Sequence, residues 1–128
     1  MKKQQILVVD DYPPILMSIK IVLERKGYTI FTATDGEQAL QVMEEKARPD
    51  LILSDIMMPQ MDGYTLYKAV RARPEWASIP FVFMTAKMGQ ECKSRAKNLG
   101  VDDYIVKPFA FQELMAVIRA WLERTKRP

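Results

Sequence analysis

Polar residues that could carry out phosphoryl transfer stand at the ends of four short hydrophobic runs. Asp10 and Asp11 follow ILVV, Asp55 follows LILS, Thr85 follows PFVFM and Lys107 follows DDYIV. In open α/β sheets the side chains at the carboxyl ends of parallel strands meet at one edge, and such proteins build their sites there. We therefore expect these five residues to converge.

Metal-assisted phosphoryl transfer is the chemistry that this set could support. Three neighbouring carboxylates raise one another's pKa unless a cation lies between them. Because the ligands are oxygens and the chain has no histidine, the expected cation is Mg²⁺, with Mn²⁺ as the alternative. A carboxylate can attack phosphorus to form an acyl phosphate. An ammonium and a hydroxyl group can bind the remaining phosphoryl oxygens.

Each of these residues also has a purely structural explanation. Asp10 and Asp11 stand ahead of a proline pair and could cap a helix. Asp55 could form a turn, Thr85 could be an ordinary hydroxyl at the end of a strand, and Lys107 could be solvated. These explanations would have to hold together at four matching strand ends, which favours the functional interpretation of the set.

Alternating strands and helices would position these residues. The expected strands are Ile6–Val9, Thr29–Ala33, Leu51–Leu53, Phe81–Met84 and Tyr104–Val106. Helical spacing is clearest in the last helix, at Leu114, Val117, Ile118 and Trp121, and the fourth helix shows it at Cys92, Ala96 and Leu99. The alternation predicts right-handed βαβ units and a single (βα)5 doubly wound α/β domain. The second strand is the most polar and is expected at an edge.

The composition indicates one globular domain of 128 residues, 48% hydrophobic and 27% charged. Only four apolar residues follow the basic start MKKQQ, so no secretion signal is predicted, and no run approaches a membrane span of about 20 residues. A single cysteine, Cys92, fits a reducing cytoplasm, which is the expected location. The net charge of +3 comes without a recognition motif, so no direct nucleic-acid or membrane binding is expected.

Four segments together resemble the receiver domain of bacterial two-component response regulators, including chemotaxis regulators. They are ILVVDDYPPI, LILSDIMMPQMDGYTL, FVFMTA and GVDDYIVKPF. The resemblance spans nearly the whole chain and implies the flavodoxin-like strand order 2-1-3-4-5. It implies a receiver over residues 1–128, with a core of about 4–124 and a tail or linker start at 125–128. Such a protein is a signalling switch, which catalyses only its own phosphorylation and dephosphorylation.

The resemblance gives each acidic residue a role. Asp55 matches the phosphoacceptor, Asp11 the direct metal ligand, and Asp10 the acid that holds the metal through water. Met57, two residues past the acceptor, would supply its backbone carbonyl to the metal.

The remaining site residues match those that bind and sense the phosphoryl group. Lys107 matches the phosphoryl-binding lysine, and its bond to Pro108 is expected to be cis. Thr85 matches the switch hydroxyl, and Tyr104 the aromatic that moves inward when Thr85 engages the phosphoryl group.

Two side chains beside the site are expected to set the lifetime of the phosphorylated state. They are Met57 and Lys87, the latter two residues past the threonine. Methionine cannot orient an attacking water, and lysine can pair with phosphoryl oxygens, so we expect slow loss of the phosphoryl group. The alternative is that both side chains point to solvent.

Phe111 stands off the apolar stripe of the last helix. One interpretation is a local contact over the helix entry. The other is that Phe111 and Tyr104 belong to an output face made by the fourth helix, fifth strand and fifth helix, which the family uses for docking and often for dimerisation.

The expected partners are a sensor histidine kinase or phosphotransfer protein, which must supply the phosphohistidine that this chain lacks, and a downstream target or output domain. Both a stand-alone receiver and a piece of a larger regulator are open, although the Met-Lys-Lys start favours a natural beginning. A Mg²⁺-dependent phosphatase is a weaker alternative, since no second acid follows the nucleophile at the spacing such enzymes use. A flavin- or nucleotide-binding protein is weaker too, since no phosphate-binding loop follows the first strand.

Overall fold

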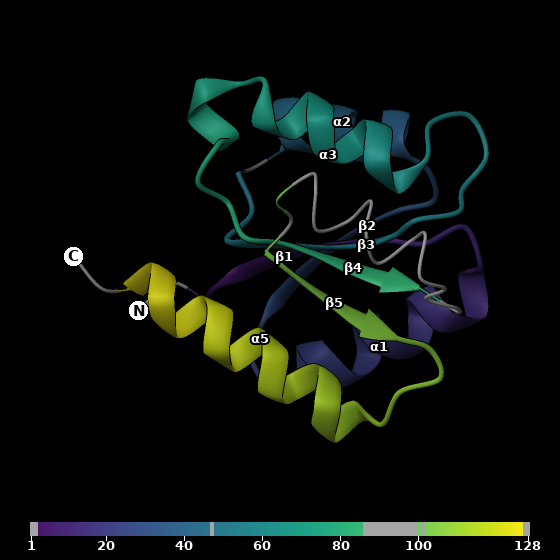
Figure 1. Cartoon of the computed structure of the whole chain (residues 1–128). Helices are drawn as coiled ribbons and strands as arrows, with labels where there is room; N and C mark the ends of the chain where they lie inside the picture. Colours follow the sequence, from purple (N-terminus) through teal and green to yellow (C-terminus); the bar gives the residue numbers. More distant parts are fainter. Residues whose placement is uncertain (1–2, 47, 86–99, 101, 127–128) are drawn as a thin grey trace.

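A parallel sheet in the order β2-β1-β3-β4-β5 forms the middle layer of the molecule (Figure 1). The computed structural model describes residues 3–46, 48–85, 100 and 102–126. Its strands are β1 (Gln5–Val9), β2 (Thr29–Ala33), β3 (Leu51–Asp55), β4 (Phe81–Thr85) and β5 (Asp103–Val106). Its helices are α1 (Pro13–Arg25), α2 (Gly36–Glu45), α3 (Gly63–Arg71), the short 3-10 helix η1 (Pro74–Trp76) and α5 (Phe111–Lys126). The expected fold class, strand order and edge position of β2 are confirmed.

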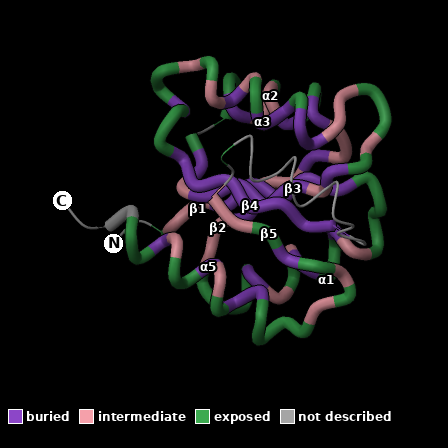
Figure 2. Tube along the Cα trace, in the orientation of Figure 1, coloured by how far each residue is buried: buried purple, intermediate pink, exposed green. Residues whose placement is uncertain are grey.

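Helices cover both faces of the sheet, and each strand contributes side chains to both faces. In β1, Leu7 and Val9 pack against α2 and α3, whereas Ile6 and Val8 pack against α1 and α5. The same alternation along β3 and β4 gives two separate apolar cores. Figure 2 shows the buried strands between helices whose outer sides are exposed.

The strands that carry the site are longer than the apolar runs that predicted them. β3 continues to Asp55, which pairs with Met84, and β4 continues to Thr85, which pairs with Val106. Backbone pairing extends past the last apolar side chain, because the hydrogen bonds of a sheet do not depend on side-chain type. Asp55 and Thr85 are therefore held within the sheet itself.

Local signals explain where the flanking helices start and stop. α1 begins with a proline pair, which the first helical turn tolerates. α2 and α3 begin after Asp35 and Asp62, whose side chains accept hydrogen bonds from the backbone of the first turn. Gly27 has a φ of 98° just after α1, a conformation that favours glycine. The expected fourth helix, with Cys92, and the position Lys87 lie outside the described residues.

Candidate functional site

Three carboxylates meet at the carboxyl end of the sheet. Asp10 directly follows β1, Asp11 is next to it, and Asp55 is the last residue of β3. One carboxylate oxygen from each lies within 4.8 Å of the other two. Asp10 is buried, Asp55 is partly buried and Asp11 is exposed, so the cluster opens to solvent on one side. An all-oxygen donor set of this kind fits Mg²⁺, which keeps several waters in its coordination sphere.

Lys107 supplies a positive charge to this cluster. Its Nζ lies 2.5 Å from Oδ2 of Asp10 and 3.6 Å from Oδ2 of Asp55. The Lys107 side chain is only 12% exposed, so the alternative of a solvated lysine does not describe it. Its backbone N–H donates to the carbonyl oxygen of Thr85, and its bond to Pro108 is cis. The end of β5 is thereby fixed beside β4, with the ammonium directed at the acids.

Asp10 has a second, structural task. Its Oδ1 accepts a hydrogen bond from the backbone N–H of Tyr12 at 2.9 Å, while Oδ2 faces Lys107. Tyr12 is the residue that precedes the first turn of α1. The capping and functional interpretations of Asp10 are therefore compatible, because each uses a different oxygen.

Hydrogen bonds along the chain hold Asp55 in place. Its Oδ1 accepts from the backbone N–H of Ile56 at 2.8 Å, and its carbonyl oxygen accepts from Oγ of Ser54 at 2.8 Å. Burial raises the pKa of the Asp55 carboxyl, and the charges of Asp10 and Asp11 raise it further. Lys107 and the Ile56 N–H act in the opposite direction. The pKa of Asp55 is raised overall, so a proton or a bound cation that neutralises its charge is favoured.

The residues expected to sense phosphorylation lie on the adjacent strands. Thr85 is buried at the end of β4, next to the end of β5. Tyr104, on β5, has 41% of its surface exposed, and Met57 has 76%. The structure thus brings Asp10, Asp11, Asp55 and Lys107 together in one cluster. Thr85 ends β4, the strand between the one that carries Asp55 and the one that precedes Lys107.

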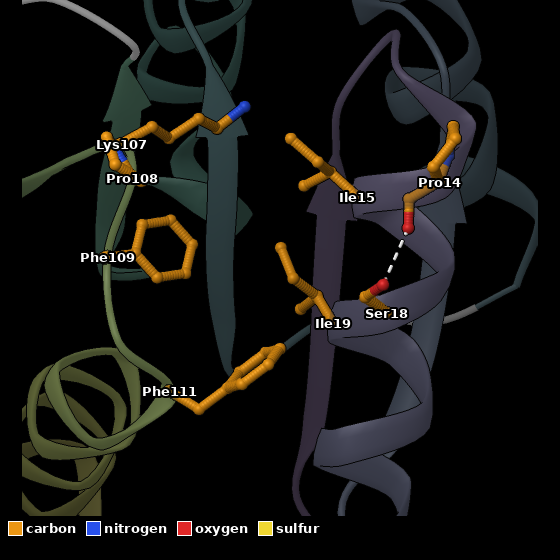
Figure 3. Close-up of a pocket in the computed structure, with 8 residues that line it drawn as sticks. All are labelled: Pro14, Ile15, Ser18, Ile19, Lys107, Pro108, Phe109 and Phe111. Carbon is orange, nitrogen blue, oxygen red and sulfur yellow. Dashed lines mark hydrogen bonds between the residues drawn. The ribbon is translucent and has the colours of Figure 1, made fainter.

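An apolar groove of about 540 Å³ runs between α1 and the start of α5 (Figure 3). Lys107 forms part of its wall, so the groove adjoins the carboxylate cluster. Phe111 lies across the groove from Ile15 and Ile19. Its side chain points toward α1 and is 42% exposed, so the local contact over the helix entry and the output-face interpretation both stay predictions.

Sequence reasoning missed the apolar wall of this groove. Its apolar residues are Pro14, Ile15, Ile19, Pro108 and Phe109, and Ser18 also lines the groove. The available signal was the cluster of apolar residues at the start of α1, Pro14, Ile15 and Ile19, whose neighbours across the groove follow only from the fold.

Comparisons with known proteins agree on one family. The model of the response regulator receiver domain matches residues 6–119. The alkaline phosphatase synthesis transcriptional regulatory protein PhoP of Bacillus subtilis is 40% identical over 123 residues, which cover 96% of this chain and 50% of PhoP. This chain spans about half the length of the curated relatives it matches.

Solved structures show the same fold at 33% identity. The signal receiver domain of a signal transduction histidine kinase from Syntrophus aciditrophicus superposes with a TM-score of 0.90, covering 98% of this chain and 94% of that one. The chemotaxis response regulator CheY4 of Vibrio cholerae gives 0.85, covering 94% and 99%. With this match along most of its length, the chain belongs to the response regulator receiver domain family of two-component systems.

Proposed function

We propose that this receiver takes a phosphoryl group onto Asp55 from a phosphohistidine of a sensor histidine kinase or phosphotransfer protein. The observation that carries the proposal is the convergence of Asp10, Asp11, Asp55 and Lys107 at one sheet edge. One carboxylate stands ready as the nucleophile, and its neighbours supply the charges that phosphoryl transfer needs.

The chain's own residues have distinct tasks in this transfer. Asp10, Asp11, Asp55 and the backbone carbonyl of Met57 would hold Mg²⁺, which neutralises charge on the phosphoryl oxygens when bound. An oxygen of Asp55 attacks phosphorus, the new O–P bond forms, and the P–N bond to the donor imidazole breaks. Lys107 is placed to bind a phosphoryl oxygen, because its ammonium already lies 3.6 Å from Asp55 Oδ2.

The phosphoryl group then shifts the equilibrium between two states of the receiver. Thr85 would turn its hydroxyl to the phosphoryl group, and Tyr104 would move inward from the exposed position that it has here. The surface around β5 changes with it and is the proposed output face, for a downstream protein, an attached output domain or a second receiver. Met57 and Lys87 are proposed to slow the loss of the phosphoryl group.

The apolar groove is the proposed contact for the phosphodonor. A donor must bring its phosphohistidine to Asp55. The groove adjoins Asp55, because Lys107 lines the groove and also contacts the Asp55 carboxylate. Ile15 and Phe111 on its two sides offer apolar surface to the donor's helices.

None of the helices in the described part of the chain has the length and hydropathy of a membrane span. We propose a cytoplasmic location, where such donors present their histidine.

One experiment tests the function. The protein is incubated with acetyl phosphate and Mg²⁺, and its mass is measured. We expect one added phosphoryl group, which is absent when EDTA is present or when Asp55 is replaced in Asp55→Asn. The matched control is Asp50→Asn, which should still be phosphorylated, because the Asp50 carboxylate accepts a hydrogen bond from the Gln5 backbone N–H and takes no part in the site. An unmodified wild-type protein contradicts the proposal, and continuous hydrolysis of the donor indicates the phosphatase instead.

A further inference from the structure

The first residue of α3, Gly63, lies directly against the main chain of the phosphoacceptor. A Cβ atom added to Gly63 would lie 2.4 Å from the carbonyl oxygen of Asp55 and 2.8 Å from Cα of Ile56. Both are backbone atoms, which cannot rotate aside as the end of a side chain can. The N–H of Gly63 also donates to the carbonyl oxygen of Ile56 at 2.8 Å. The start of α3 therefore holds the Asp55–Ile56 backbone by contact and by a hydrogen bond.

The same backbone orients the Asp55 carboxylate. The Ile56 N–H donates to Oδ1 of Asp55, so the position of this peptide fixes one of the two carboxylate oxygens. Ser54 donates from its hydroxyl to the carbonyl oxygen of Asp55 and holds the other side of the peptide. A displacement of Ile56 would therefore shift the carboxylate relative to Asp10 and Lys107.

We propose that Gly63 is a positioning residue for phosphorylation of Asp55. Its missing side chain lets α3 approach the Asp55–Ile56 backbone, and this contact sets the carboxylate for the metal and the phosphoryl group. Met57 follows Ile56 directly, so the contact also sets the carbonyl that is proposed to bind the metal. The inference rests on the proposed function of Asp55 and adds the element that positions it.

Gly36 is a matched control for Gly63. Each glycine is the first residue of its helix, and each follows an aspartate that caps that helix. A Cβ atom on Gly36 would instead lie 2.7 Å from Cγ, 2.8 Å from Sδ and 2.9 Å from Cβ of Met61, which are all side-chain atoms and none of them backbone. Replacement by alanine changes intrinsic helix propensity equally at both positions. The difference between the two variants therefore reports what the added methyl group meets.

The test compares Gly63→Ala and Gly36→Ala with the wild type, at a temperature where thermal unfolding shows each to be folded. Mg²⁺ affinity is measured by isothermal titration calorimetry, and phosphorylation by acetyl phosphate is followed by mass spectrometry. We expect Gly63→Ala to bind Mg²⁺ at least tenfold more weakly and to react at least tenfold more slowly, while Gly36→Ala stays within twofold of the wild type. A merely structural role would lower the unfolding temperature but leave both quantities unchanged. A folded Gly63→Ala protein within twofold of the wild type overturns the proposal, as does an equal loss in Gly36→Ala.

Amide NMR resonances keep the inference testable if Gly63→Ala does not fold. In the wild type we expect the amide resonances of Ile56 and Gly63 to shift with one midpoint as Mg²⁺ is added, while that of Gly36 stays in place. A stationary Gly63 resonance beside a shifting Ile56 resonance overturns the proposal. A wild type that neither binds Mg²⁺ nor reacts contradicts the proposed function instead. In that case the Ile56 amide resonance of the metal-free proteins decides: it must shift between the wild type and folded Gly63→Ala, and an unchanged resonance overturns the inference.

Discussion

Replacing Lys107 by methionine would remove the ammonium group that neutralises Asp10 while keeping most of the aliphatic stem. Asp10 is fully buried, and the Lys107 side chain is 12% exposed. Removal of one partner from a buried ion pair costs about 3–5 kcal/mol, because the other charge stays buried without compensation. We expect the lower end, about 3 kcal/mol, because the cluster opens to solvent at Asp11.

This loss is large enough to measure by calorimetry in EDTA. The entropy of unfolding of a chain of this length is about 0.27 kcal/mol/K, so a loss of about 3 kcal/mol lowers the unfolding temperature by about 11 °C. Mg²⁺ should then replace the missing ammonium as the counter-charge. We therefore expect Lys107→Met to bind Mg²⁺ on the order of tenfold more tightly than the wild type, a difference of about 1.4 kcal/mol.

Lys20 is the control, because its ion pair with Glu24 lies on the surface. Lys20→Met should change the free energy of unfolding by less than about 0.5 kcal/mol and leave Mg²⁺ affinity unchanged. If Lys107→Met unfolds in EDTA within about 2 °C of the wild type, or binds Mg²⁺ more weakly, the ammonium does not neutralise the cluster as described.

Three further predictions concern the acceptor, its neighbours and the groove. Burial and the adjacent acids raise the pKa of Asp55, so its charge opposes folding above that pKa. Asp55→Asn should therefore unfold at a higher temperature than the wild type in EDTA at neutral pH. This difference in unfolding temperature should shrink as the pH falls toward 3.8, because the wild-type carboxyl becomes protonated. A difference that stays constant across this range contradicts a raised Asp55 pKa. Met57→Asn combined with Lys87→Glu should lose the phosphoryl group faster than the wild type in a mass-spectrometric decay assay, and equal rates refute the lifetime proposal. Ile15→Lys should slow phosphorylation by a phosphohistidine protein that serves the wild type, but not by acetyl phosphate; equal slowing with both donors rules out the groove as the contact.

The convergence at the site was predictable because it depends on strand ends, whereas the strand order followed from the family resemblance. Asp10, Asp55, Thr85 and Lys107 each end an apolar run, and parallel strands carry such residues to one edge. Which side chains pair with one another at this edge of the sheet was not predictable. The contact between Lys107 and Asp10 joins residues 97 positions apart, and its distance depends on how β5 sits in the sheet.

Residues whose role depends on packing were also beyond the sequence. Helical periodicity places Phe111 off the apolar stripe, but it does not say that α1 is the neighbour its side chain meets. Gly63 follows a capping aspartate as Gly36 does, and the two look equivalent along the chain. Only the distance to the Asp55 backbone separates them.

Helix α5 connects the two ends of the molecule. It begins with Phe111 beside the groove and, over 16 residues, extends about 24 Å toward the end of the sheet where β1 starts (Figure 1). A fluorescent reporter fused after this helix would thus start one helix length from the carboxylates, too far away to contact them. It would respond to Asp55 only if α5 tilts or slides as a rod, and the stiffness of the fusion joint would set how much of that movement becomes a signal.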